Sequence, residues 1–350
     1  MVEITVHASK KYTVKVGENL LGHLGMDAAS VVSGRNAVIV SDSNVWPIYG
    51  AAATHSMETA AFQVDCFVIP AGEASKSGEN YLKLLNFLAG RQITRSDCLV
   101  ALGGGVIGDL TGFAAATYLR GIPYIQAPTT LLGMVDSSVG GKTAIDLPAG
   151  KNLAGAFYQP SLVLCDTDTL KTLPADRFTE GCAEVIKYGI LYDGPLFSHL
   201  EDTGKSFDRE YIIGKCIEWK KQAVMEDEFD TGCRRMLNLG HTIGHSIEKA
   251  TNYRVSHGAA VAIGISCMAR YAASRDLCHR NDCDRIINLL DHFGLPTQTS
   301  LSPDILVHHA LSDKKRSGDR ITLVLPATIG CCKLIEIPVN DLKNLVKEGM

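Results

Sequence analysis

The chain has 350 residues, of which 46% are hydrophobic and 21% charged, and its formal net charge is −4. This composition is typical of a globular protein of about two domains, and it excludes a strongly basic nucleic-acid-binding protein. No apolar run is long enough to span a membrane. Since none of the 11 cysteines forms a C-x-x-C pair and we recognise no signal peptide, we expect a cytoplasmic protein with reduced thiols and no membrane partner.

The first half of the sequence alternates strand and helix patterns. Residues 3–7 and 12–16 predict an opening hairpin because apolar and polar residues alternate in both. Buried strands are predicted at 37–40, 67–70, 98–102 and 162–166, with an amphipathic helix at 80–87 between the second and third. This rhythm predicts an open, mostly parallel, Rossmann-like sheet with helices on both faces and ligands at the carboxyl ends of its strands.

A glycine-rich turn follows the strand at 98–102. Residues 103–109 read GGGVIGD, which matches G-x-G-x-x-G between a predicted strand and a predicted helix. Such a turn lets the backbone approach a pyrophosphate at a helix N-terminus, although a tight structural turn is the alternative. The acid expected about twenty residues downstream is absent. Asp42, after an earlier strand, is a better ribose partner, so we expect a topology other than the usual Rossmann order.

Residues 128–143 are rich in hydroxyl groups and glycine. Gly141, Lys142 and Thr143 resemble the end of a P-loop, but Asp136 stands where its first glycine should be, which excludes a nucleoside triphosphate site. Lys142, Lys151 and Asn152 could instead hold a phosphate. The alternative is a solvated loop.

The second half of the chain is mainly helical. Helices are predicted near 211–226, 234–250, 257–274, 281–293 and 341–347, with late strands at 321–325 and 333–337. We therefore expect an α/β domain at 1–170 and a mainly helical domain at 171–350. Glu184 and Lys187 lie three residues apart on one helical face, either as a surface ion pair or as part of a site.

Two histidines lie four residues apart in the predicted helix at 234–250. This spacing places His241 and His245 on one face, about one turn apart, and His257 follows. The pattern suggests a divalent metal of the zinc type, and core or capping histidines are the alternative. No glutamate follows His241 directly, so the zinc-protease motif is excluded.

The motif blocks occur in a distinctive order between about residues 35 and 326. They are 103–109, 136–142, 151–152, 183–187, 234–245 and 257–258, and together the set resembles the 3-dehydroquinate synthase family of sugar-phosphate cyclases. The resemblance implies a homodimer in which each chain has an NAD-binding α/β domain and an all-α metal-binding domain, with the active site between them.

The resemblance also implies roles for individual residues. Glu184, His241 and His257 would bind Zn²⁺ or Co²⁺, whereas His245 would contact the substrate phosphate and take part in proton transfer. Arg120 would reach the phosphate bound by the neighbouring subunit. The NAD-contacting positions would be Asp42, Asn44, Glu73, Lys76, Gly104, Gly105, Val106, Asp109, Thr129, Thr130, Leu132, Lys142, Lys151, Thr172 and Leu173. The substrate positions would be Asp136, Lys142, Asn152, Lys187, Lys220, Arg234, Asn238 and one of Lys314 or Lys315.

The implied reaction converts 3-deoxy-D-arabino-heptulosonate 7-phosphate to 3-dehydroquinate through transient oxidation by NAD, phosphate elimination, reduction and aldol closure. Arg234 and Lys220 would hold the substrate carboxylate. The substrates of cyclases that act on sedoheptulose or glucose phosphates have no such carboxylate. Two alternatives stay open. One is an NAD-dependent metal alcohol dehydrogenase that accumulates NADH, and the other is a structural metalloprotein.

Overall fold

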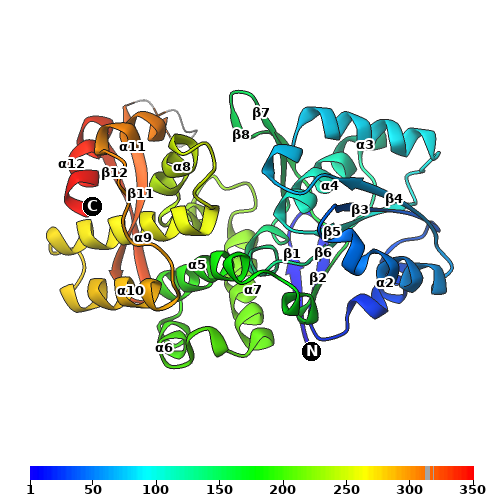
Figure 1. Cartoon of the computed structure of the whole chain (residues 1–350), viewed down its shortest axis with the longest axis horizontal. Helices are drawn as coiled ribbons and strands as arrows, with labels where there is room; N and C mark the ends of the chain where they lie inside the picture. The colour runs from blue at the N-terminus through cyan, green and yellow to red at the C-terminus, as the bar shows by residue number, and fades with distance from the viewer. Residues whose placement is uncertain (312–315, 318) are drawn as a thin grey trace. The chain divides into compact units, whose positions relative to one another are not determined.

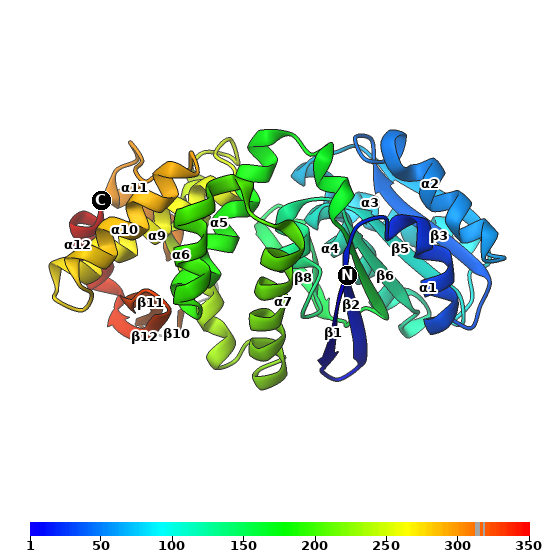
Figure 2. The same cartoon turned by 90° about the horizontal axis from the view of Figure 1, so that it is seen from below.

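A computed structural model describes residues 1–311, 316–317 and 319–350, which form two compact units (Figure 1). Unit 1 comprises Met1–Pro174 and Arg209–Phe229, and unit 2 comprises Ala175–Asp208 and Asp230–Met350. The first unit thus includes helix α7 (Arg209–Glu226), which the sequence assigned to the helical domain. A helical sequence pattern does not show which unit a helix joins, and this helix packs along the opening hairpin (Figure 2).

Unit 1 is built on a seven-stranded sheet in the order β1-β2-β9-β6-β5-β3-β4. All neighbouring strands are parallel except the opening pair, β1 and β2. The predicted hairpin and buried strands are confirmed, and the sequence missed only β6 within this sheet. The strands are β1 Val2–His7, β2 Lys11–Gly17, β3 Asn36–Asp42, β4 Gln63–Ile69, β5 Cys98–Gly103, β6 Tyr124–Pro128 and β9 Leu162–Asp166.

Helices cover both faces of this sheet, as predicted. Ile39 of β3 packs with α1 (Leu24–Val31) and α2 (Trp46–Thr59) on one face. Its neighbour Val38 packs with α3 (Gly78–Gly90) and α4 (Gly105–Thr117) on the other, because successive residues of a strand point to opposite faces. In Figure 1, α3 and α4 lie above the sheet and α2 lies below it.

The strand order reverses between β3 and β5. The five strands from β3 onward run in the spatial order 2-1-3-4-5 when counted along the chain, which is the flavodoxin-like order rather than the usual Rossmann order. Ligands of such sheets bind where the order reverses, outside the carboxyl ends of the strands. In this chain those ends carry Asp42 and Gly103.

The segment after β6 contains regular structure that the sequence did not predict. A π-helical turn covers Gly133–Ser137, and strands β7 (Lys142–Leu147) and β8 (Gly150–Phe157) form a separate antiparallel hairpin. The solvated loop that stood as the alternative for this segment is therefore excluded. Most of β8 is at least partly exposed, so it lacks the alternation that reveals a half-buried strand.

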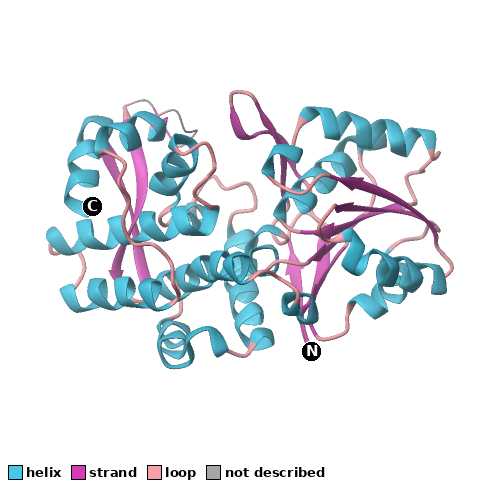
Figure 3. Cartoon of the chain, viewed as in Figure 1, coloured by secondary structure: helices cyan, strands magenta, loops and turns pink. Residues whose placement is uncertain are grey.

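Unit 2 is mainly helical, and its late strands pair as an antiparallel sheet of three strands (Figure 3). The unit is therefore not built of helices alone. Its strands are β10 Arg316–Ser317, β11 Arg320–Thr328 and β12 Cys331–Pro338. Its helices are α5 Ala175–Leu191, α6 Gly194–Thr203, α8 His241–Ala250, α9 His257–Ser274, α10 Arg280–His292, α11 Pro303–Ala310 and α12 Leu342–Gly349.

The continuous helix predicted at 234–250 is wrong. Gly240 has a φ of +78° and separates a 3-10 helix at Cys233–Asn238 from α8. A side chain at Gly240 would lie 2.6 Å from the carbonyl oxygen of Val261, so the backbone of α9 approaches closely here. His241 is consequently the first residue of α8. Within the described ranges of the chain, no helix is long and apolar enough to cross a membrane.

Asp97 fixes the backbone at the amino end of the sheet, opposite the glycine turn. Its carboxylate accepts hydrogen bonds from the backbone nitrogens of Asn36 at 3.0 Å and Thr94 at 2.8 Å, and from the Thr94 hydroxyl at 2.7 Å. Burial raises the pKa of Asp97, but these hydrogen bonds outweigh burial, and the net pKa lies below the ordinary value.

We expect Asp97→Asn to lower the free energy of unfolding at pH 7 by about 1–3 kcal/mol, because an amide cannot accept at both positions. The stabilisation from the carboxylate is fully present above its unfolded pKa of about 3.9 and is lost as the pH falls through the lower folded pKa. Urea denaturation of both proteins from pH 7 to pH 3 measures this. A stability difference that stays constant over that range would contradict it.

Candidate metal and dinucleotide sites

Three helices of unit 2 bring Glu184, His241 and His257 together. Their potential ligand atoms all lie within 4.8 Å of one another. Glu184 comes from the middle of α5, whereas the two histidines open α8 and α9. The Nε2 atom of each histidine lies 3.5 Å from Glu184 Oε1. A carboxylate and two imidazoles match the three-ligand set of catalytic zinc sites, which leave one position open for substrate.

Both histidines are oriented by an acceptor at their other ring nitrogen. His241 Nδ1 lies 3.0 Å from the carbonyl oxygen of Leu239, and His257 Nδ1 lies 3.2 Å from Glu248 Oε2. With Nδ1 bonded in this way, each Nε2 faces Glu184 and is the ring nitrogen that could bind a metal. Such outer contacts fix the tautomer and raise the basicity of metal-binding histidines.

Glu184 is a buried carboxylate and pairs with Lys187 one turn later on α5. A buried charge is costly unless opposite charges compensate it, and a divalent cation between Glu184 and the histidines would supply that compensation. The negative charges around Glu184 also act on His257. Burial lowers the pKa of His257, but the carboxylates of Glu184 and Glu248 raise it to about 10. A metal would have to displace this proton. The donor set therefore fits a divalent ion of the zinc type.

His245 lies beside this group rather than in it. Its ring centroid is 5.5 Å from that of His241 and 6.0 Å from that of His257. A second potential ligand group contains His245, Glu248 and His257. Neither group among the described residues contains both His241 and His245, so the initial prediction that these two form a ligand pair is wrong. The i, i+4 spacing did place both rings on one side of α8.

The glycine turn of unit 1 has the predicted strand–turn–helix context. Gly104 is the extended residue before α4, and no side chain caps this helix. Added side chains at Gly104 and Gly105 would lie 3.2 Å from atoms of Thr130 and Ser137 respectively. The turn is thus tight against the segment after β6. Because no side chain caps α4, its first backbone nitrogens could donate to a pyrophosphate.

Four of the predicted NAD contacts form one ionic cluster. Lys76 Nζ lies 3.0 Å from Glu73 and 3.2 Å from Asp109, and Lys151 lies 3.1 Å from Glu73. Burial alone would lower the pKa of Lys76, but the surrounding carboxylates raise it above its ordinary value. Burial raises the pKa of Asp109 despite the contact with Lys76. A further member, Asp146, lies 3.8 Å from Lys76 and was missed from the sequence.

The other predicted NAD contacts follow the carboxyl ends of neighbouring strands. Asp42 accepts hydrogen bonds from the backbone of Asn44 at 2.8 Å and of Val45 at 3.1 Å, which shapes the turn after β3. The Thr172 hydroxyl lies 2.5 Å from that of Tyr49. Val106 is the second residue of α4. Thr129, Thr130 and Leu132 come directly after β6, and Thr172 and Leu173 come after β9.

The predicted substrate residues occur in both units. In unit 1, Lys220 of α7 donates to the Asp136 carboxylate at 2.6 Å and also to its backbone carbonyl. Lys142 opens β7 and Asn152 lies in β8, both exposed. Arg120, also exposed, ends a 3-10 turn with a φ of +66°.

In unit 2, Arg234 and Asn238 belong to the 3-10 helix before α8, and Arg234 is only 1% exposed. Lys187 lies in α5 beside Glu184. Lys314 and Lys315 lie outside the described residues. Sequence reasoning missed Glu248, although its place three residues after His245 on α8 was a readable signal.

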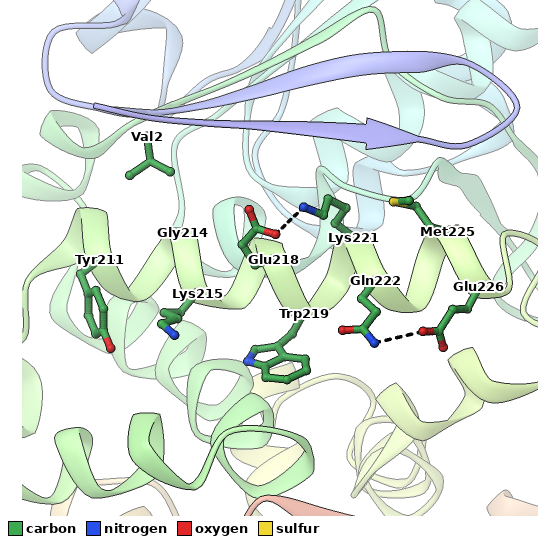
Figure 4. A pocket seen from close by; sticks show the side chains of 10 residues that line it. All are labelled: Val2, Tyr211, Gly214, Lys215, Glu218, Trp219, Lys221, Gln222, Met225 and Glu226. Atoms are coloured by element: carbon green, nitrogen blue, oxygen red, sulfur yellow. Dashed lines mark hydrogen bonds and ion pairs between the residues drawn. The ribbon is translucent and has the colours of Figure 1, made fainter.

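An open hollow of about 600 Å³ lies along α7 beside Val2 (Figure 4). It contains none of the predicted site residues. Its lining includes the aromatic rings of Tyr211 and Trp219 and the side chain of Met225. Lys220 of the same helix is buried and bonds to Asp136, outside this lining. The convergence of charged side chains, rather than cavity size, therefore locates the candidate sites.

Comparison with known proteins identifies related sequences along nearly the whole chain. Residues 66–180 match the family described as 3-dehydroquinate synthase N-terminal, and residues 181–316 match 3-dehydroquinate synthase C-terminal. A 3-dehydroquinate synthase of Nostoc punctiforme is 41% identical over 97% of both chains. One from Xylella fastidiosa is 44% identical over 93% of this chain and 87% of its own.

A similar solved structure is 2-deoxy-scyllo-inosose synthase complexed with carbaglucose-6-phosphate, NAD⁺ and Co²⁺. It has a TM-score of 0.89 and 25% identity, and the match covers 100% of both chains.

We expect Glu248→Ala to weaken Zn²⁺ binding about 10- to 100-fold, because His257 would lose the carboxylate that orients it. Competition with a chromophoric chelator measures the affinity. Glu201→Ala is the matched control, since Glu201 pairs with Arg285 at 2.6 Å elsewhere in the same unit. Equal zinc affinity in wild type and Glu248→Ala would contradict the orienting role.

Proposed function

Because the chain belongs to the 3-dehydroquinate synthase family, we propose that it converts 3-deoxy-D-arabino-heptulosonate 7-phosphate to 3-dehydroquinate and phosphate. This would make it a carbon–oxygen lyase of the shikimate pathway that depends on NAD and a divalent metal. The observation that carries the proposal is the family match over both halves of the chain, each of which contains one of the two charged groups described above.

The proposed cofactors fit the residues of the two units. The glycine turn and the cluster around Lys76 would hold NAD⁺, and Glu184, His241 and His257 would hold Zn²⁺ or Co²⁺. When bound, NAD⁺ supplies a reversible hydride acceptor and the metal supplies a Lewis acid that polarises a substrate hydroxyl. The complex of the related inosose synthase with NAD⁺ and Co²⁺ supports this assignment.

The chain's own residues would orient the substrate, bind its phosphate group and assist proton transfer. Lys142, Asn152 and His245 would hold the phosphate, whose own oxygen is then placed to accept the proton that is lost in the elimination. His245 would take part in proton transfer. Exclusion of water would protect the reactive intermediates before ring closure.

Arg234 and Lys220 distinguish the proposed substrate from those of sibling cyclases. Arg234 is almost fully buried, and the planar guanidinium of an arginine can bind a substrate carboxylate through two parallel hydrogen bonds. Asp136 holds Lys220 at 2.6 Å, so the ammonium would be oriented before substrate binds. These two cations support a substrate that carries a carboxylate.

We further propose a cytoplasmic homodimer in which Arg120 reaches the phosphate bound by the partner subunit. Arg120 is exposed and held in a left-handed turn, with Leu119 before it at a φ of +50° and Gly121 after it at +124°. Such backbone strain concentrates at functional positions, and this supports a role for the turn.

A second candidate function, an NAD-dependent metal alcohol dehydrogenase, would use the same metal and dinucleotide groups but has no use for the phosphate-binding residues. The discriminating experiment measures phosphate release from the heptulosonate phosphate by zinc-loaded protein, with and without NAD⁺, while 340 nm absorbance is recorded. NAD-dependent release without net NADH supports the synthase. Steady NADH growth with a polyol and no phosphate release would support the dehydrogenase instead.

We expect Arg234→Ala to raise the KM and to lower kcat/KM for the heptulosonate phosphate at least tenfold, because the carboxylate loses its partner. Arg234→Lys should recover part of this loss, since a lysine keeps the charge without the fork. Arg177→Ala, which removes an exposed arginine paired with Glu180, is the control. An unchanged kcat/KM in Arg234→Ala would refute the carboxylate role.

A further inference from the structure

We propose that Asp146 is a positioning residue that fixes Asn152 for the substrate phosphate and is itself anchored to the NAD-binding segment at Lys76. The inference rests on the proposed function, and it adds a residue that none of the motif blocks contains. Its basis is the way in which one carboxylate joins two segments of unit 1 that are far apart in sequence.

Asp146 lies at an irregularity of the β7–β8 hairpin. The pairing register shifts between Ile145 and Leu147, so no residue of β8 is the ladder partner of Asp146. Such bulges redirect a side chain. The backbone of Asp146 instead bonds to the segment before α3: its nitrogen donates to the Lys76 carbonyl at 2.8 Å, and it forms an isolated parallel bridge with Ser77. The hairpin is thereby joined to the segment that carries Lys76.

The Asp146 carboxylate supports an unusual backbone conformation. Its Oδ1 atom accepts a hydrogen bond from the backbone nitrogen of Asn152 at 2.9 Å. Asn152 has a φ of +54°, in the left-handed region that residues other than glycine adopt only with local support. Asn152 is also exposed. The hydrogen bond that its backbone donates to Asp146 helps to fix the position from which the amide side chain extends.

The ionic cluster holds the carboxylate from its other side. Lys76 Nζ lies 3.8 Å from the same Oδ1 atom, while Glu73 and Asp109 lie closer to that ammonium. Asp146 is thus the outermost carboxylate around a buried lysine. Glu73 also contacts the hairpin, through Lys151 at 3.1 Å, whereas the described contacts of Asp146 reach Asn152. Its hydrogen bond to Asn152, rather than its charge alone, is the contact through which it would act on substrate.

The experiment compares Asp146→Ala with Asp146→Asn. Alanine removes the acceptor, so we expect kcat/KM for the heptulosonate phosphate to fall at least tenfold, mainly through KM. Asparagine keeps an oxygen at the same place and should stay within threefold of wild type. Calorimetry with a non-eliminable phosphonate analogue should show the same pattern, whereas the Kd for NAD⁺ should change less than threefold in either variant.

A double-mutant cycle tests whether Asp146 acts through Asn152. In an Asn152→Ala background, Asp146→Ala should change kcat/KM by less than twofold, because the group that it positions is already gone. A tenfold loss that persists in that background would overturn the proposal, and so would equal impairment of Asp146→Ala and Asp146→Asn. If Asp146→Ala does not fold, Asp146→Glu, which displaces the oxygen by one methylene, should show the same loss, and wild-type kinetics in that variant would overturn the proposal.

Asp97→Asn is the structural control, because Asp97 also clamps backbone nitrogens but at the opposite end of the sheet. It should lower stability and leave the phosphonate affinity unchanged. Failure of the proposed function can be distinguished from failure of the role of Asp146. If the proposed function is wrong, wild-type protein will release no phosphate at all. Active wild-type protein with an unaffected Asp146→Ala variant would instead overturn only the role of Asp146.

Discussion

The buried carboxylate of Glu184 is the constraint on which unit 2 depends. A fully buried negative charge requires compensation, and three elements converge to supply it: α5 itself through Lys187, and the first residues of α8 and α9 through His241 and His257. Because helices are packed to bring these groups within 4.8 Å, the unit holds an arrangement that a divalent cation completes. Glu248 then sets the orientation of His257 from outside.

Close backbone approaches make this convergence possible. A side chain at Gly258, directly after His257, would lie 2.3 Å from the Glu180 carbonyl oxygen, so α9 begins in contact with α5. At Gly264 it would lie 2.0 Å from the Gly240 carbonyl oxygen, which draws α9 against the start of α8. Glycines at these contacts let the two histidines reach the carboxylate on α5. The geometry of the candidate metal site in this unit therefore depends on how closely α5, α8 and α9 pack.

The sequence predicted most of the sheet and the ordered motif blocks, because buried strands and glycine turns are local signals. It also placed Glu184, His241 and His257 correctly in one group, but only through the resemblance to a family, since helical spacing alone favoured His245. Glu248 and Asp146 were missed because their roles arise from contacts across elements. The β7–β8 hairpin was missed because its exposed strand has no apolar alternation. Helix α7 shows the same limit, since no local pattern tells which unit a helix joins.

The most direct test of this account is anomalous X-ray diffraction at the zinc absorption edge from crystals of the zinc-loaded protein. Two overlapping ligand groups share His257, and only the position of the ion distinguishes them. We expect a single peak coordinated by Glu184, His241 and His257 Nε2, with Glu248 bonded to the other nitrogen of His257. A peak held by His245, Glu248 and His257, or no peak near Glu184, would contradict the account.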